Sequence, residues 1–295
     1  MAIFVEKYDI LLTISPKDTP IARLHSYLLS AVAPRPIALA STIDLNGNSN
    51  LSPFSFFNVF SANPPVLIFS PARRVRDNTV KHTLENVLET KEVVINVVSF
   101  DLVHQTSLSS TEYQKGINEF EKAGLTMLPS DLVKPFRVAE SPVQFECRVQ
   151  EVKELGTEGG AGNLIICEVL RMHVDESILD DKQNIDQDKL DLVARAGGSY
   201  YSRAKSSFFE IPKPLQSKGV GVDALPDSVR TSKVLTGNDL GRLGNIDELP
   251  QKSVVDKFLE DNRQFMGLKL SEKHKFAQEF LEKNDTDSAI KLLLS

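Results

Sequence analysis

Short apolar runs, each ended by turn-forming residues, fill the first two thirds of the chain and predict an antiparallel β-sheet. The run at residues 36–42 is followed by an Asn46-Gly47 pair, which is favoured in type I′ turns, and by a second extended stretch, so this region predicts a hairpin. Apolar or alternating runs predict further strands at residues 65–70, 92–98, 143–155 and 163–174. Because these strands follow one another without parallel crossovers, an antiparallel barrel is favoured over a doubly wound sheet.

One amphipathic helix is predicted between two of these strands. Apolar residues recur there at the spacing of a single helix face, at Val80, Leu84 and Val87. Asp77 or Asn78 is the predicted N-cap, because these side chains accept hydrogen bonds from the first free N–H groups of a helix.

The composition changes after about residue 201. Prolines and glycines divide residues 211–227 into a predicted surface loop, and the tail then becomes helical. Ser271 is the predicted N-cap of a helix that carries Phe276 and Phe280 on one face, and Asp287 is the predicted N-cap of a final short helix.

The chain has 295 residues, of which 41% are hydrophobic, and this is enough for a large core. We predict a barrel domain over residues 1–205 and a loop and helical extension over residues 206–295, which packs on the barrel or on a partner subunit. The formal net charge of -6 gives no electrostatic basis for a nucleic-acid partner. The N-terminus lacks the pattern of a signal peptide and no window is apolar enough to span a membrane, so we expect a cytoplasmic protein.

Two features that suggest cofactor chemistry have simpler explanations. Cys147 and Cys167 lie in apolar strand-like runs without the nearby Cys or His residues of a zinc site, so we expect buried reduced thiols and no metal. Residues 219–224 fit the letters of a dinucleotide fingerprint, but prolines on both sides disfavour the strand and helix that this motif requires.

The segment of residues 70–83 carries four cations, Arg73, Arg74, Arg76 and Lys81, between a strand end and a helix start. The first turn of a helix offers free N–H groups and a partial positive charge, and these cations add to it, so the segment suits a phosphate dianion. A solvated basic loop explains the charge alone equally well.

Residues 34–61 combine hydrogen-bonding side chains with aromatic rings. The candidate hydrogen-bonding residues are Ser41, Thr42, Ser55 and Asn58, and the rings are Phe54, Phe56 and Phe57. Together with the basic segment, this set fits a flat, amphipathic, phosphorylated ligand. In the alternative, the rings form core and the hydroxyls form turns. Since side chains alternate faces along an extended run, the three rings cannot all contact one ligand, and at least one must be core.

Several segments, in this order, resemble the flavin reductase-like, FMN-binding split-barrel family. They are residues 34–42 (PRPIALAST), 50–70, 81–96, 119–126 (EFEKAGLT), 139–149, 162–179 and 194–203 (ARAGGSYYSR). The resemblance covers roughly residues 20–205. It implies a mainly β fold with flanking helices, a six-stranded antiparallel split barrel, and a homodimer that binds FMN at or near the subunit interface.

The resemblance also implies which residues bind the flavin. They are Ala40, Ser41, Thr42, Ser55, Phe56, Phe57, Asn58, Ser70, Arg73, Lys81 and Thr83. One departure is that the family commonly has Lys-Asp-Thr where this chain has Lys81-His82-Thr83. Without that aspartate as a cap, either Lys81 or the upstream arginines hold the phosphate.

The favoured activity is hydride transfer between NAD(P)H and flavin, with reduced flavin passing electrons onward, to a partner protein among other acceptors. His173 and Tyr200 lie in family-like segments and are candidates for the nicotinamide side, although a hydrogen-bonded histidine at a strand end explains His173 equally well. Two alternatives remain: an FMN-binding electron carrier or storage protein without a pyridine-nucleotide site, and a flavin-dependent oxidoreductase acting on another substrate. The choice of NADH or NADPH, the way FMN is held and the final acceptor stay open.

Overall fold

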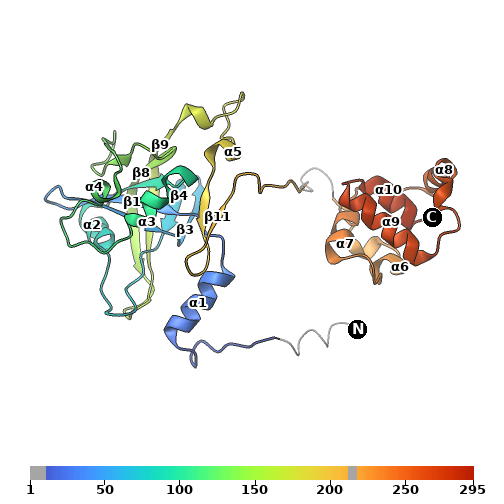
Figure 1. The fold of residues 1–295 in the computed structure, drawn as a ribbon, viewed down its shortest axis with the longest axis horizontal. Helices are drawn as coiled ribbons and strands as arrows, with labels where there is room; N and C mark the ends of the chain where they lie inside the picture. The colour runs from blue at the N-terminus through green and yellow to red at the C-terminus, as the bar shows by residue number, and fades with distance from the viewer. Residues whose placement is uncertain (1–10, 212–217) are drawn as a thin grey trace. The chain divides into compact units, whose positions relative to one another are not determined.

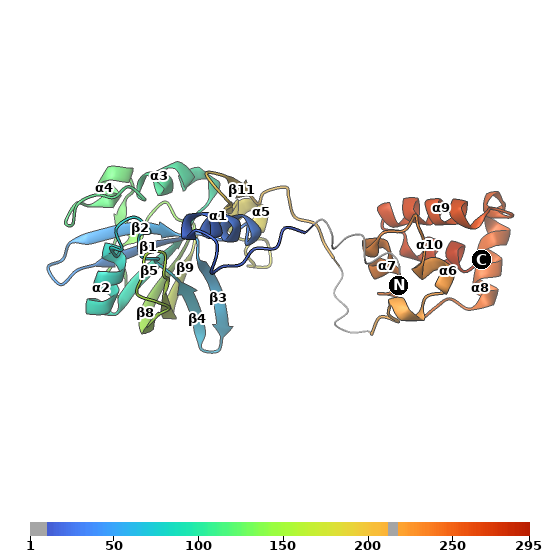
Figure 2. The ribbon, with the colours of Figure 1, turned by 90° about the horizontal axis from the view of Figure 1, so that it is seen from below.

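The computed structural model describes residues 11–211 and 218–295, which form two compact units, one ending at Phe208 and the other beginning at Phe209. The first ten residues and part of the predicted loop at 211–227 lie outside the described residues. The first unit is mainly β with flanking helices (Figure 1). Its main sheet has the strand order β2-β1-β5-β8-β9-β4-β3, with every neighbouring pair antiparallel (Figure 2).

The predicted hairpin and strands are present in this sheet. Its strands are β1 (Ala38–Ile43), β2 (Ser49–Phe54), β3 (Phe57–Ala62), β4 (Pro65–Phe69), β5 (Glu92–Val97), β8 (Val143–Glu154) and β9 (Asn163–Val174). Two small sheets pair β6 (Met127–Leu128) with β7 (Arg137–Val138) and β10 (Val193–Arg195) with β11 (Tyr201–Arg203).

The sheet curls so that its two edges approach each other. The edge strands β2 and β3 are consecutive in the chain, and only Ser55 and Phe56 lie between them. Two residues span about 10 Å at most, so the end of one edge lies close to the start of the other, as in a barrel with one open seam. Figure 2 shows the β3–β4 hairpin extending away from the rest of the sheet.

The predicted number of six strands is wrong, because the sheet has seven. The sequence around residues 49–62 reads as one extended stretch, but the bend at Ser55 and Phe56 divides it. The half before the bend pairs with β1 and the half after it pairs with β4, so one predicted strand becomes two.

Helices and hydrophobic clusters close the first unit, and two of these clusters border the predicted site. The helices are α1 (Ile21–Ala31), α2 (His82–Thr90), η2 (Phe100–Leu102), α3 (Val103–Leu108), α4 (Glu119–Ala123), η3 (Glu176–Ile178) and α5 (Gln187–Leu190). One cluster packs Leu84 and Val87 of α2 against strands β1, β4, β5, β8 and β9, and the other packs Phe120 of α4 against β1 and β2. Cys147 and Cys167 are free thiols in the first cluster, and burial raises the pKa of both.

Helix α2 begins later than predicted, at His82 with Lys81 as its N-cap residue. Asp77 does not cap the helix; instead its Oδ1 accepts hydrogen bonds from the backbone N–H and the hydroxyl of Thr79. Asn78 has φ +56°, a left-handed conformation that a right-handed helix cannot contain. The basic segment therefore forms a separate loop, and Lys81 stands where that loop meets the helix.

The second unit is helical and has a core of its own residues, among them Leu243, Leu281 and Ile290. Its helices are η4 (Val222–Ala224), α6 (Asp227–Arg230), α7 (Gly237–Leu243), α8 (Lys252–Asp261), η5 (Arg263–Phe265), α9 (Leu270–Glu282) and α10 (Thr286–Leu293). The predicted caps are each two residues too late, since the N-caps of α9 and α10 are Lys269 and Asp285. Packing of this unit on the barrel or on a partner subunit stays a prediction.

No helix among the described residues is long and apolar enough to cross a lipid bilayer.

Stability of the helical unit is expected to fall as the pH falls below about 6.5, because of His274. This side chain is buried, and its Nδ1 lies 2.7 Å from the Ser232 Oγ, which also accepts the backbone N–H groups of Val234 and Leu235. The serine hydroxyl therefore donates to a neutral ring, and burial lowers the pKa of His274 from its ordinary value of 6.5. As the pH falls, the His274 ring takes up a proton in the unfolded chain before it does so in the folded chain. The stabilisation from the neutral buried ring is therefore complete above pH 6.5 and is lost below it.

The measurement is thermal unfolding of the full chain, followed by far-ultraviolet circular dichroism, between about pH 7.5 and 5. The control is His274→Gln, whose helical transition should depend less on pH. An equal pH dependence in both proteins would refute the assignment to His274.

Candidate functional site

The β1 residues of the predicted site lie inside the first unit. Ala40, Ser41 and Thr42 have no exposed surface, and β1 is paired with β2 on one side and with β5 on the other. Within the described residues the Ser41 hydroxyl has no hydrogen-bond partner. These residues therefore lie beneath the surface of the predicted site, with no atoms exposed to a ligand.

Thr42 and Thr83 are brought together by two buried asparagines that sequence reasoning missed. The Thr42 Oγ1 accepts from Asn86 Nδ2 at 3.0 Å and from Asn50 Nδ2 at 3.4 Å, and Asn50 Nδ2 also donates to Thr83 Oγ1 at 2.9 Å. All four side chains are buried. Asn86 follows Thr83 by three residues on α2, and that spacing was the available signal that both face the sheet.

Replacing Thr42 by valine is expected to lower the stability of the apo-protein by about 1–3 kcal/mol. Valine matches the shape of threonine but leaves the buried amide of Asn86 without its acceptor, whereas the Asn50 amide keeps Thr83. An unsatisfied buried donor costs about that amount. Chemical denaturation of the apo-protein measures the loss. A Thr42→Ser variant keeps the hydroxyl and should lose less, so equal losses in the two variants would count against this network.

The bend between β2 and β3 carries the exposed part of the predicted site. Ser55 and Phe56 form the bend, Phe57 packs its ring partly into the first cluster, and Asn58 is exposed on β3. The backbone N–H of Ser70 donates to the Phe56 carbonyl at 2.9 Å, so the end of β4 lies beside this bend. Five of the predicted residues therefore lie at or next to this bend, at the barrel seam: Ser55, Phe56, Phe57, Asn58 and Ser70.

Ser70 and the residues after it lie beside the turn between β8 and β9. The Ser70 Oγ would lie 2.8 Å from a Cβ added to Gly162, and the amide of Arg73 donates to the Ala161 carbonyl at 2.8 Å. A side chain at position 162 would push the Ser70 hydroxyl aside, and glycine leaves room for it.

Arg35 is a third residue that the site prediction omitted. Its guanidinium is buried and donates to the carbonyls of Leu29, Val32 and Ala196, and at 3.4 Å to the Ser55 hydroxyl. It therefore joins the C-terminal end of α1 to the bend at Ser55. A cation at that end of a helix is also favoured by the helix dipole.

The arginines of the basic loop are engaged with the protein. Arg73 donates to the side chain and carbonyl of Asn78. Arg74 and Arg76 pair with carboxylates, Glu112 for both and Asp77 for Arg76 as well.

Lys81 differs from these arginines. No hydrogen bond or ion pair of its ammonium is recorded within residues 11–211 and 218–295, and the side chain is half-buried. Burial lowers the pKa of Lys81, and the neighbouring Arg74 lowers it further. The cation left free to bind an anion at the start of α2 is therefore Lys81.

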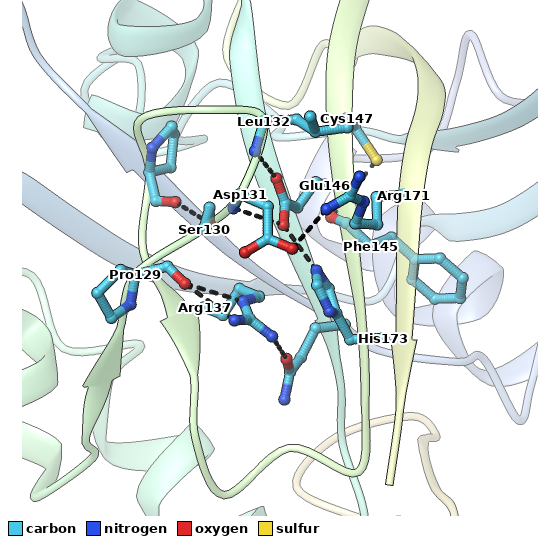
Figure 3. A network of polar contacts seen from close by, with 12 residues as sticks. Pro129, Ser130, Asp131, Leu132, Arg137, Phe145, Glu146, Cys147, Arg171 and His173 are labelled. Carbon is cyan, nitrogen blue, oxygen red and sulfur yellow. Dashed lines mark hydrogen bonds and ion pairs between the residues drawn. The ribbon is translucent and has the colours of Figure 1, made fainter.

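His173 is held by a buried carboxylate. Its Nε2 lies 2.6 Å from Oε1 of Glu146, and the Glu146 oxygens also accept the backbone N–H groups of Asp131 and Leu132 (Figure 3). Glu146 has no exposed surface. His173 therefore helps to fix the loop at residues 129–132 to the sheet, which is the structural alternative that the sequence left open.

The atoms of Asp131, Glu146 and His173 lie within 4.8 Å of one another, close enough to share a metal ion. However, both Glu146 oxygens already accept N–H groups, and Asp131 pairs with Arg171 at 2.6 Å (Figure 3). A guanidinium at this position repels a cation, and the cluster is complete without one.

Comparison with known proteins gives the family. Residues 30–195 match the model of the flavin reductase like domain, and this is more than half of the chain. The chain belongs to the flavin reductase-like family. An uncharacterized protein of Aquifex aeolicus is 40% identical over 188 residues, which are 64% of this chain and 93% of the relative.

Two solved structures share the fold of this flavin reductase-like chain. Component B of nitrilotriacetate monooxygenase from Bacillus cereus is 27% identical with a TM-score of 0.64, covering 68% of this chain and 98% of that one. A protein with a split barrel domain from Shewanella frigidimarina is 25% identical with a TM-score of 0.59, covering 69% of this chain and all of that one.

The matched range includes every predicted flavin-binding residue and His173, but it ends before Tyr200. Tyr200 is 76% exposed and lies just before β11. The helical unit also lies outside the flavin reductase-like match.

Proposed function

We propose that this protein is an FMN-binding oxidoreductase that transfers hydride between NAD(P)H and flavin. The observation that carries the proposal is the half-buried Lys81 ammonium at the start of α2, for which the described residues provide no partner. In a flavin reductase-like chain, a cation of this kind fits the phosphate that distinguishes FMN from riboflavin.

The start of α2 suits a phosphate for a second reason. Lys81 is the N-cap residue, and no side chain caps the first turn, so the N–H groups of His82 and Thr83 are free of such a bond. An anion at a helix N-terminus is favoured by these N–H groups and by the helix dipole. Thr83 itself is buried, so we assign its side chain to the network with Asn50 and not to the phosphate.

The seam residues suit the isoalloxazine ring. Ser55 and Asn58 supply polar side chains there, and Phe56 and Phe57 supply flat apolar surface. Phe57 and Val80, the residue before Lys81, both pack against the first hydrophobic cluster, so the seam and the phosphate site border the same core.

FMN, when bound, supplies the hydride chemistry, and the protein contributes binding, orientation and exclusion of water. Lys81 and the first turn of α2 hold the phosphate, and Ser55 and Asn58 orient the ring. The structural similarity to component B of a monooxygenase supports a partner protein as one acceptor of the electrons.

A homodimer is part of this proposal. The edge strand β3 exposes Val59 and Phe60 to 63% each, and none of the residues of α1 is buried. Apolar side chains on an exposed sheet edge favour covering by another chain. Light scattering should give about twice 32.7 kDa for the wild type. Val59→Lys combined with Phe60→Lys should give a monomer, whereas a monomeric wild type would contradict the dimer.

The activity is tested by turnover. Purified protein with added FMN should oxidise NADH or NADPH faster than FMN alone, followed by the loss of dihydronicotinamide absorbance. The matched control is the Lys81→Ala variant at an FMN concentration that saturates only the wild type. No oxidation above the rate of FMN alone, with either nucleotide, would contradict a reductase.

A further inference from the structure

Glu112 pairs with two arginines of the basic loop from a distant part of the chain. Its Oε1 lies 3.0 Å from Arg74 Nε, and its Oε2 pairs with Arg76 Nη2. Glu112 lies in the turn that follows α3, 38 residues after Arg74. The hydrogen bonds from Arg76 and Arg74 lower the pKa of the Glu112 carboxyl, so it is an anion at neutral pH.

This ion-pair cluster borders Lys81 directly. Arg74 Nη1 donates to the carbonyl of Val80, the residue before Lys81, at 2.7 Å, and to the Thr79 hydroxyl at 2.8 Å. The charges of Arg74 and Glu112 act on Lys81 in opposite directions. A phosphate bound at Lys81 would therefore be attracted by the charge of Arg74 and repelled by the charge of Glu112, which is paired with Arg74.

The loop does not depend on Glu112 for its shape. Arg74 is anchored by Thr79 and Val80, and Arg76 is also paired with Asp77. The Glu112 side chain is 39% exposed, so it can leave the arginines for water without unfolding its surroundings. A carboxylate bound by two guanidiniums takes the place that these donors offer to an anionic ligand.

We infer that Glu112 is an internal counter-ion that competes with the flavin phosphate for the basic loop and so weakens FMN binding. This inference rests on the proposed function and deepens it, because it bears on whether FMN is held permanently or exchanges. With Glu112 in place, part of the positive charge beside Lys81 is already used, and FMN dissociates more readily. Riboflavin has no phosphate and should not sense Glu112.

The test is Glu112→Gln, with FMN and riboflavin affinities measured by flavin fluorescence at low and at high salt. Removing one negative charge beside a phosphate should tighten FMN binding by about fivefold at low salt, and the gain should shrink as salt screens it. Riboflavin affinity should stay the same. Glu112→Asp keeps the charge and should stay closer to the wild type.

The matched control is Asp131→Asn, which removes a carboxylate of another exposed arginine pair, that with Arg171, and should leave FMN affinity unchanged. Thermal unfolding checks that each variant is folded, and if Glu112→Gln is not, Glu112→Ser replaces it. If the wild type prefers FMN to riboflavin but Glu112→Gln binds FMN no more tightly than the wild type, the role of Glu112 as a counter-ion is wrong and the phosphate site still stands. A wild type without that preference would instead overturn the phosphate site of the proposed function, and this inference with it.

Discussion

Lys81→Ala is expected to weaken FMN binding by about ten- to a hundredfold and to leave the melting temperature of the apo-protein nearly unchanged. A hydrogen bond to a charged group contributes about 1.5–3 kcal/mol, which corresponds to that range of affinity. Because no partner of the Lys81 ammonium is recorded in the described part of the chain, its removal should break few contacts of the apo-protein. Fluorescence titration and thermal unfolding measure the two effects.

The matched control is Arg73→Ala. Arg73 belongs to the same loop, but its guanidinium donates to Asn78, so its loss should weaken FMN binding much less. Riboflavin should bind wild type and both variants equally. If Lys81→Ala binds FMN as the wild type does, or weakens riboflavin as much as FMN, the phosphate is not held at Lys81.

Phe54→Ala is expected to destabilise the apo-protein by about 3–5 kcal/mol, the usual loss for a vacated aromatic site in a core. Phe54 is 8% exposed and belongs to the first hydrophobic cluster, where its ring centroid lies 5.4 Å from that of Phe69. The well-packed neighbours of this ring cannot fully collapse into the space it leaves. Chemical denaturation gives the free energy of unfolding.

Phe56→Ala is the control for the same change at a neighbouring ring. Phe56 is 40% exposed and contacts His25 and Arg35 at the surface, so it should lose about 1 kcal/mol or less. Equal losses in the two variants would mean that the bend does not separate a core ring from a surface ring.

The sequence predicted the strands well because their signals are local. The Asn46-Gly47 turn and the alternation of residues 143–155 each report on a few neighbours in the chain, and both hairpins form as expected. The bend that makes seven strands out of six has no such signal. It depends on the pairing of β2 and β3 with opposite edges of the sheet, which is set by contacts between distant residues.

The start of α2 shows the same limit at shorter range. Asp77 and Asn78 are both good N-caps by residue type. Asp77 instead accepts a hydrogen bond from the Thr79 hydroxyl, and Asn78 takes a left-handed conformation and binds Arg73. The N-cap of the helix is therefore Lys81. Competing local hydrogen bonds of this kind are not separable from the residue types alone.

For the site, the sequence located the segments but did not show which side chains are already bonded to other parts of the protein. Thr42 and Lys81 were both predicted to bind flavin, yet the hydroxyl of Thr42 is engaged by buried asparagines. Glu112 lies more than 30 residues from the arginines that it pairs with, and Glu146 accepts hydrogen bonds from the loop at residues 129–132. Such pairings depend on the tertiary fold, and no spacing in the chain indicates them.

The central claim is most directly tested by anaerobic stopped-flow mixing of the FMN-loaded protein with NADH or NADPH. A reductase should bleach the flavin absorbance with at least one of the nucleotides, and faster than the same nucleotide bleaches free FMN. If the flavin stays oxidised with both nucleotides and is bleached only by dithionite, the protein binds flavin without accepting hydride from a pyridine nucleotide, and the proposed activity is wrong.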